Sequence, residues 1–291
     1  MGDFENQSIW DHASKNIIGL VICGSVFTAG FFIHGNAAVY LNLSGFVIVM
    51  GGTLGATFLS FRAERLVILA KVLKAAYTKP LRNPDDMVEM MVDLSVKKKL
   101  RGLLSLQMDE EETAILFLRQ AVGFLVDGCS MEQIREFLNA EMYFFKMRRD
   151  ETCRVLQAMA EIAPAFGVVG SVVGLVGMLS GMGNSTVIMS TIPVALTSTL
   201  YGIVLSNFFL YPFIANIRER TVQELFLQKI ISEGMTAIAG DIHPRMVERK
   251  LKAYLTPSAR KDDLISLAKI KEQLEKKVGD QPADLTEEME N

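Results

Sequence analysis

Residues 162–217 read IAPAFGVVGSVVGLVGMLSGMGNSTVIMSTIPVALTSTLYGIVLSNFFLYPFIANI, and these 56 residues include no Asp, Glu, Lys or Arg. A second uncharged stretch, between Lys15 and Arg62, is 46 residues long. One helix needs roughly 20 apolar residues to cross the hydrocarbon core of a bilayer. Each stretch therefore has room for two crossings, and the sequence predicts an all-α integral membrane protein in contact with membrane lipid.

Turn-forming residues divide each uncharged stretch near its middle. The first is broken at His34, Gly35 and Asn36, and the second at Gly181, Gly183, Asn184 and Ser185. This division predicts four transmembrane helices, arranged as two hairpins, at about residues 17–33, 39–60, 162–181 and 188–213. The chain then has five parts: an N-terminal segment 1–16, the hairpins 17–61 and 162–213, a helical region 62–161, and a C-terminal helix and tail 214–291.

Composition and charge agree with a membrane protein and argue against nucleic acid as a partner. Hydrophobic residues make up 50% of the chain and charged residues 22%, and the formal net charge is −3. Sixteen of the 30 Lys and Arg residues lie in 62–161 and thirteen in 218–291, whereas neither turn carries any. By the positive-inside rule, we expect both termini and the region 62–161 in the cytoplasm. The N-terminus lacks the pattern of a cleaved signal peptide, so the first span is expected to be retained.

The region 62–161 is expected to consist of helices. Asn83-Pro84-Asp85-Asp86 has the form of a helix start, and Asp109 to Glu112 opens a second helix that runs to Gly128. Ser130 and Gln133 have the spacing of a capping box. From there the helical pattern reaches the third span without a stop signal, which predicts one long helix. The tail begins as a continuation of the fourth span, and its end is expected to be disordered.

No motif of an enzyme, a metal site or a cofactor site occurs in the sequence. The cysteines Cys23, Cys129 and Cys153 show no C-x-x-C spacing, and the three histidines lie far apart. Neither a phosphate-binding loop nor a hydrolase motif is found. We therefore expect no catalytic residue, no resident metal and no cofactor.

Glycines form a bare stripe along the third span. At 100° per residue they fall on one face, with two G-x-x-x-G spacings, and they are Gly167, Gly170, Gly174, Gly177 and Gly181. Such a stripe lets another helix approach closely. Two partners remain open for it: the fourth span of the same chain alone, or also a neighbouring subunit or central partner.

Prolines and hydroxyl side chains are the other distinctive residues of the last two spans. Pro164, Pro193 and Pro212 each remove a backbone donor and could act as hinges, although proline is also simply commoner in membrane helices. Hydroxyl oxygens can replace the water shell of a hard cation such as sodium, or they can bond to carbonyls of their own helix. Those available here belong to Ser171, Thr197, Ser198 and Thr199.

No Asp or Glu lies within any of the four predicted spans. Proton and cation relays inside membranes typically use a carboxylate that can change its charge. If this chain conducts ions, the carboxylate must therefore come from a partner chain with its own transmembrane acid.

The runs Ala163–Leu175 (APAFGVVGSVVGL) and Ala195–Asn207 (ALTSTLYGIVLSN) strongly resemble the MotA/PomA family of flagellar stator proteins. Shorter matches are Gly51-Gly52-Thr53, Arg101–Leu106 and Val126-Asp127-Gly128, within a resemblance that covers roughly residues 15–256. It implies a homopentamer in the bacterial inner membrane around two copies of a MotB/PomB-like subunit. That single-span subunit would bind peptidoglycan and supply the membrane Asp, and ion flow would turn the flagellar rotor.

The resemblance also implies roles for single residues of the ion pathway. Pro164 and Pro212 match family prolines that couple ion binding to movement. Ser171, Ser198 and Thr199 match hydroxyl positions associated with sodium. Sodium is therefore favoured over protons as the coupling ion, although serine replaces threonine at two of these positions.

The family contacts its rotor switch protein through basic and acidic residues of the cytoplasmic region. Lys99 stands at the basic position, near Arg101, but Gln107 stands at the acidic one. The nearby Glu110 and Glu111 are expected to supply the negative charge, or else only to cap a helix.

Two other functions stay open at the level of the sequence. One is a stator-like motor of the wider MotA/TolQ/ExbB family that drives a non-flagellar process, which a different periplasmic domain on the partner would indicate. The other is a transporter or scaffold that acts alone, for which an acid inside a span or an unwound helix would be expected.

Overall fold

The computed structural model describes residues 22, 24–26, 29–30, 40–78, 82–106 and 115–255, without the side chains of 104 and 105. Within these ranges the chain consists of helices and the turns between them, with no strand. The all-α fold is therefore confirmed. The chain forms two compact units: the first unit comprises Met1–Pro80 and Met147–Val222, and the second unit comprises Leu81–Lys146 and Gln223–Asn291.

Three helices are long and apolar enough to cross a membrane within the described ranges. They are α2 (Leu43–Ser60), α7 (Met131–Ser180) and the continuous run Ser185–Ala239, which comprises α8 (Ser185–Val204), the π-helix η3 (Leu205–Leu210) and α9 (Tyr211–Ala239). These helices contain the predicted spans 39–60, 162–181 and 188–213 almost completely. The span predicted at 17–33 lies largely outside the described residues, so the total of four stays a prediction.

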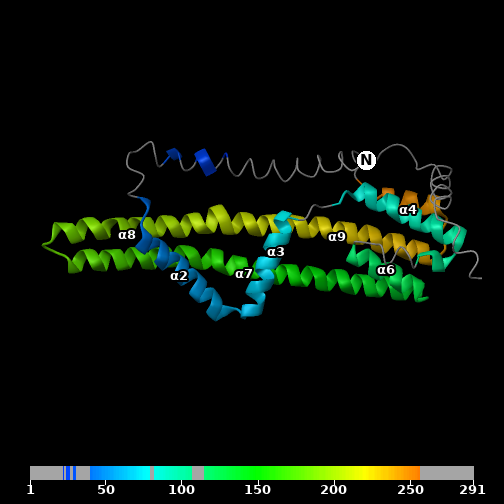
Figure 1. Ribbon diagram of the computed structural model, residues 1–291, viewed down its shortest axis with the longest axis horizontal. Coiled ribbons are helices and arrows are strands. Elements are labelled where there is room, and N and C mark those ends of the chain that lie inside the picture. The colour runs from blue at the N-terminus through cyan, green and yellow to red at the C-terminus, as the bar shows by residue number, and fades with distance from the viewer. Residues whose placement is uncertain are drawn as a thin grey trace, which may run out of the picture. The chain divides into compact units, whose positions relative to one another are not determined.

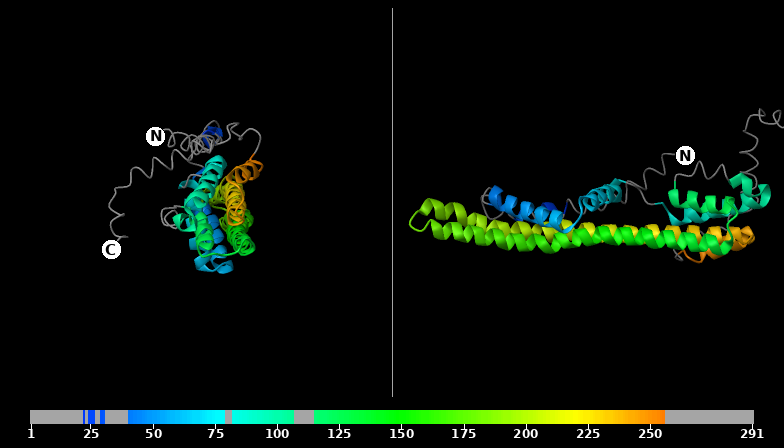
Figure 2. Two further views of the ribbon diagram at one scale, coloured as in Figure 1. Left: turned by 90° about the vertical axis from the view of Figure 1, so that its right-hand side faces the viewer. Right: turned by 90° about the horizontal axis from the view of Figure 1, so that it is seen from below.

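The first unit is built on the hairpin of α7 and α8, which lie side by side in both orientations of the molecule (Figures 1 and 2). The turn between them contains Gly183 at φ 98°, a conformation that favours glycine. Asn184 then caps α8, because its side chain accepts a hydrogen bond from the backbone of Thr186. The predicted break between the last two spans is thus a turn followed by a capped helix start.

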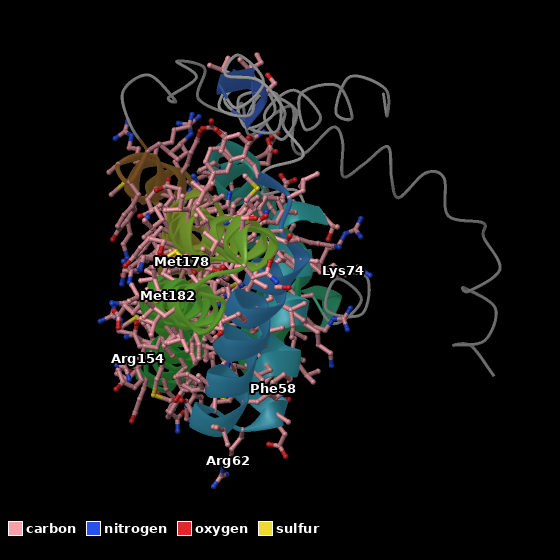
Figure 3. All side chains as sticks on the ribbon, turned by 90° about the vertical axis from the view of Figure 1, so that its left-hand side faces the viewer. Phe58, Arg62, Lys74, Arg154, Met178 and Met182 are labelled. Atoms are coloured by element: carbon pink, nitrogen blue, oxygen red, sulfur yellow. The ribbon has the colours of Figure 1, made fainter. Side chains whose placement is uncertain are left out.

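Helix α2 packs against this hairpin, and α3 (Ala63–Thr78) follows it. Asn42 caps α2 by accepting a hydrogen bond of 3.0 Å from the backbone N–H of Gly45. Gly45, Val49, Thr53 and Thr57 form its buried stripe, at the i, i+4 spacing of one helix face. Just beyond α2, Arg62 points away from the helices and marks the return of charged residues (Figure 3).

The second unit has a conventional apolar core between several helices. It contains α4 (Pro84–Arg101), the 3-10 helix η2 (Leu103–Leu106), α6 (Leu116–Val126), α10 (Pro244–Lys252) and parts of α7 and α9. Its core includes fully buried residues from four helices, such as Met91, Leu118, Ile134 and Ile231. Burying each such side chain stabilises the fold by about 1.5–3 kcal/mol.

Several predicted helix boundaries are confirmed. Helix α4 begins at Pro84, directly after Asn83. The capping box forms, because Ser130 N–H donates to Gln133 Oε1 and Gln133 N–H donates to Ser130 Oγ. The long helix is α7, which runs for 50 residues without interruption. The helix predicted to run from Asp109–Glu112 to Gly128 is shorter than expected: Ile115 is extended, α6 begins at Leu116 and ends at Val126, and Gly128 adopts φ 76°. Asp109–Glu112 themselves and the C-terminal end of the tail lie outside the described residues.

Candidate functional site

The glycine stripe of α7 packs against α8 of the same chain. A β-carbon at Gly170 would lie 2.5 Å from Ser198 Cβ, and one at Gly174 would lie 2.6 Å from the backbone nitrogen of Ala195. Both distances are too short for any side chain to fit. Gly167 and Gly177 are also in the contact, facing the backbone oxygen of Ser198 and the Thr191 methyl group. The backbones of α7 and α8 are therefore in close contact along the glycine stripe, as its G-x-x-x-G spacings predict.

Two hydroxyls meet at this close contact. The hydroxyl oxygens of Ser171 on α7 and Thr199 on α8 lie 2.5 Å apart and share a hydrogen bond. Ser171 Oγ is also within hydrogen-bond distance of the Ala195 carbonyl, and it lies 3.2 Å from the Gly167 carbonyl. Thr199 Oγ1 lies 3.5 Å from that same carbonyl. We call these four oxygens the oxygen cluster.

The oxygen cluster has more lone pairs than hydrogens. Each carbonyl accepts the backbone N–H four residues later in its helix and keeps one lone pair, while each hydroxyl has two lone pairs and one hydrogen, so lone pairs outnumber the two hydroxyl hydrogens. Ser171 and Thr199 are both half-buried, so the cluster is not sealed inside the chain. A half-open group of neutral oxygens is suited to a hard cation that has lost part of its water shell.

Ser198 does not join this cluster. Its hydroxyl is completely buried and donates to the carbonyl of Val194 on its own helix, at 2.6 Å. It faces α2, where a β-carbon at Gly45 would lie 2.8 Å from the Ser198 oxygen. Ser198 lies one residue before Thr199 and therefore points about 100° away around the helix. The structure thus brings together two of the three hydroxyls predicted from the family, and Ser198 has a packing role.

Pro164 lies in the same helix contact, seven residues before Ser171. A β-carbon at Gly202 of α8 would lie 2.6 Å from the carbonyl oxygen of Ala163 and 3.1 Å from Pro164 Cα. The α8 backbone is therefore held against α7 at the proline. Helix α7 remains continuous through this position.

The other two prolines lie in different surroundings. Pro212 is exposed and is the second residue of α9, directly after the π-helix η3. Pro193 lies inside α8, and its carbonyl accepts a hydrogen bond of 2.7 Å from Thr197 Oγ1.

Helix α2 covers the hairpin and is tied to it by a tyrosine that sequence reasoning missed. The hydroxyl of Tyr201 on α8 accepts a hydrogen bond of 2.8 Å from Asn42 N–H and donates to the Tyr40 carbonyl. The ring of Phe166 packs on Gly52 of α2. That contact gives a physical reason for the Gly51-Gly52-Thr53 match, since any side chain at Gly52 would collide with the ring.

Acidic groups are absent from the part of the spans that the structure describes. Neither α2 nor residues 162–217 include Asp or Glu. Throughout the described ranges, no three His, Cys, Asp or Glu side chains come together as a possible metal site. The oxygen cluster is therefore electrically neutral and lacks the charge that a cation site in a membrane needs.

The basic residues at the end of α4, in the second unit, differ in their surroundings. Lys98 donates to the Ile238 carbonyl and pairs with Asp241 at 2.7 Å, and this hydrogen bond lowers the pKa of the Asp241 carboxyl. The predicted contact residues Lys99 and Arg101 are exposed instead. Glu110, Glu111 and Gln107 lie outside the described residues.

Comparison with known proteins identifies similar chains over most of the sequence. Residues 109–230 match the MotA/TolQ/ExbB proton channel family. The uncharacterized protein YtxD of Bacillus subtilis is 32% identical over 82% of this chain and 87% of its own. The chemotaxis protein PomA of Vibrio alginolyticus is 28% identical over 84% and 96%, respectively.

A solved structure is also similar to this chain over most of its length. The C. jejuni MotAB structure contains a chain that superposes with a TM-score of 0.77 at 26% identity, over 87% of this chain and 98% of that one. The match to a family of proton channels agrees with the expectation that the chain is not an enzyme. The chain belongs to the MotA/TolQ/ExbB family and, within it, to the MotA/PomA flagellar stator proteins.

Proposed function

We propose that this chain is the ion-conducting A-type subunit of a flagellar stator and that it works with a single-span, MotB-like subunit. The observation that carries the proposal is the oxygen cluster, in which Ser171 and Thr199 meet at 2.5 Å between α7 and α8. The cluster offers oxygen ligands but no charge. A membrane Asp from the partner completes the site and changes its charge as ions bind and leave.

Sodium is the proposed coupling ion. Two hydroxyl and two carbonyl oxygens suit the partial replacement of a sodium water shell. A proton requires only the partner's carboxylate and makes no use of the cluster. The sodium proposal therefore rests on Ser171 and Thr199 and no longer on Ser198, whose hydroxyl is bonded to its own helix.

The proposed assembly is a homopentamer around two partner chains in the inner membrane. Both termini and the second unit lie in the cytoplasm, as the distribution of Lys and Arg favours. The partner is held by peptidoglycan, so that ion flow turns the ring around it. The exposed Lys99 and Arg101, with Glu110 and Glu111, contact the rotor switch protein.

A pull-down tests the partnership first. The tagged chain is extracted in mild detergent from membranes of its own host, and the bound chains are identified and their molar ratio measured. We expect a single-span protein with an intramembrane Asp and a peptidoglycan-binding domain. Recovery of an intact oligomer of this chain alone would contradict the proposal and favour a transporter or scaffold.

The ion is tested by rotation. The speed of beads attached to flagella is measured while external sodium is varied at constant pH and constant membrane potential. The expected result is a saturable dependence on sodium, with no change when pH is varied at constant sodium and constant potential. Rotation that persists without sodium and follows the proton gradient would identify protons as the ion and leave the stator assignment standing.

A further inference from the structure

The hydrogen-bond ladder of α7 has a gap at Pro164. Proline has no N–H, so the carbonyl of Ala160, four residues earlier, lacks its ordinary helical donor. Ala160 is only 1% exposed and belongs to the apolar core of the first unit. A buried carbonyl without a donor is costly, so nearly all such groups in native proteins find a partner.

The missing donor is supplied by a side chain from another helix. The hydroxyl of Ser206, in the π-helix η3, donates to the Ala160 carbonyl at 2.6 Å. Ser206 is 2% exposed, so water does not compete for this bond. Other buried hydroxyls of the first unit behave differently, since Ser198 and Thr221 donate to carbonyls of their own helices.

The π-helix accounts for the position of Ser206. Pro212 cannot donate either, and its ring would collide with a carbonyl four residues earlier in a regular helix. The wider turn of η3 precedes it, and the N–H of Tyr211 bonds to the Ser206 carbonyl, five residues back. The π-helix that precedes Pro212 thus positions the Ser206 hydroxyl, which compensates for the missing N–H of Pro164.

We propose that Ser206 is a positioning residue for Pro164, and that its hydroxyl is a latch that holds the α7 backbone in one of two arrangements. A side-chain hydrogen bond can break and re-form while the rest of the α7 ladder stays intact. When it is made, Pro164 is fixed against Gly202. When it is broken, this part of α7 moves freely. The role in rotation rests on the proposed stator function, whereas the hydrogen-bond coupling between Ser206 and Pro164 does not.

A double-mutant cycle tests the coupling. Pro164→Ala restores a backbone N–H that can donate to Ala160, so Ser206 becomes dispensable for that carbonyl. The complex is purified with Cys23 and Cys129 replaced by serine, and a thiol-reactive dye reports the exposure of the buried Cys153 on heating. Ser206→Ala should lower the thermal midpoint by about 2–4 °C in the parent. It should have little effect in the Pro164→Ala background.

The matched control is Thr221→Val. Thr221 is also buried and donates to a carbonyl, that of Ile217, but this carbonyl has a regular backbone donor. Its effect should be the same in both backgrounds. An equal decrease for Ser206→Ala in both backgrounds would overturn the proposal, because the hydroxyl would then not compensate for the proline.

Measurements of rotation speed distinguish a positioning role of Ser206 from a purely stabilising one. At saturating ion, Ser206→Ala and the similarly sized Ser206→Cys should turn several-fold more slowly, with an unchanged half-saturating ion concentration, while Ser206→Thr should retain most of the speed. Parental speed in Ser206→Ala or Ser206→Cys would overturn the role as a latch. If the parent complex drives no flagellum at all, the proposed function fails, yet the thermal cycle still decides the coupling.

Discussion

Gly174 shows how a single residue sets the distance between two helices. The glycine stripe to which it belongs could be predicted from the sequence, because the glycines recur at helical spacing. The helix that packs on the stripe could not be predicted, because a face without side chains suits either α8 or a helix of another chain. In the structure α8 fills it, and the backbone of Ala195 lies where a Gly174 side chain would be.

Gly174→Ala should therefore separate α7 from α8. Its β-carbon would lie 2.6 Å from a backbone nitrogen, which no rotamer change can relieve. We expect a destabilisation of about 1–3 kcal/mol or more, seen as a lower amount of protein in the membrane by immunoblotting. Gly55→Ala, in α2, is the control, since a β-carbon there meets nothing within 4 Å. Equal losses in the two variants would refute the packing argument.

Thr199 is the hydroxyl whose removal should act on the ion. Thr199→Ala deletes one of the four oxygens of the cluster while leaving the helix contact in place. The sodium concentration for half-maximal rotation speed should rise several-fold, and Ser198→Ala should raise it less, because the Ser198 hydroxyl is bonded to Val194. An unchanged sodium response in Thr199→Ala would remove the main support for sodium as the coupling ion.

Among the elements, α7 and the run from α8 to α9 differ in how well the sequence predicts them. Helix α7 could be anticipated as one long element because no stop signal follows the capping box at Ser130. The π-helix η3 could not, since a shift of hydrogen-bond register leaves apolar periodicity almost unchanged. Helix α10 is also marked in the sequence, because Pro244 at its start and Arg249, Lys250 and Lys252 in its last turn are ordinary helix signals.

Replacing the proline of α7 should stop movement without stopping assembly. Pro164→Leu restores a backbone donor and so makes α7 a regular helix that no longer needs its neighbour's hydroxyl. We expect rotation to be lost, while the amount of complex recovered by pull-down stays at the parental level. If the protein instead disappears from the membrane, Pro164 is needed for folding rather than for movement.

At the scale of the whole molecule, charged residues are confined to some parts of the chain, and this distribution is evident in both the sequence and the structure. Residues 162–217 have no charge, whereas the second unit carries ion pairs such as Lys98 with Asp241 and Lys250 with Glu233. The division into an uncharged region long enough to cross a membrane and a charged region was therefore predictable from the sequence. The different surroundings of adjacent lysines were not, because they depend on how α4 meets the turn before α10.

That difference allows rotor contact to be tested with a matched pair. Lys99→Glu reverses an exposed charge and should reduce torque, most strongly at low intracellular ionic strength, because exposed charge pairs are screened by salt. Its thermal midpoint should equal that of the parent. Lys98→Glu should lower the midpoint instead, because it loses the bonds to Ile238 and Asp241. Parental torque in Lys99→Glu at every ionic strength would place the rotor contact elsewhere.

The neutral oxygen cluster also bears on inheritance. If this chain provides the neutral oxygens of the site and another chain provides the charge, neither gene alone provides a motor. A host that acquired only this gene would gain a membrane protein with no benefit to motility. We therefore expect the two genes to be transferred, retained and lost as a pair, which can be checked by their joint occurrence across genomes.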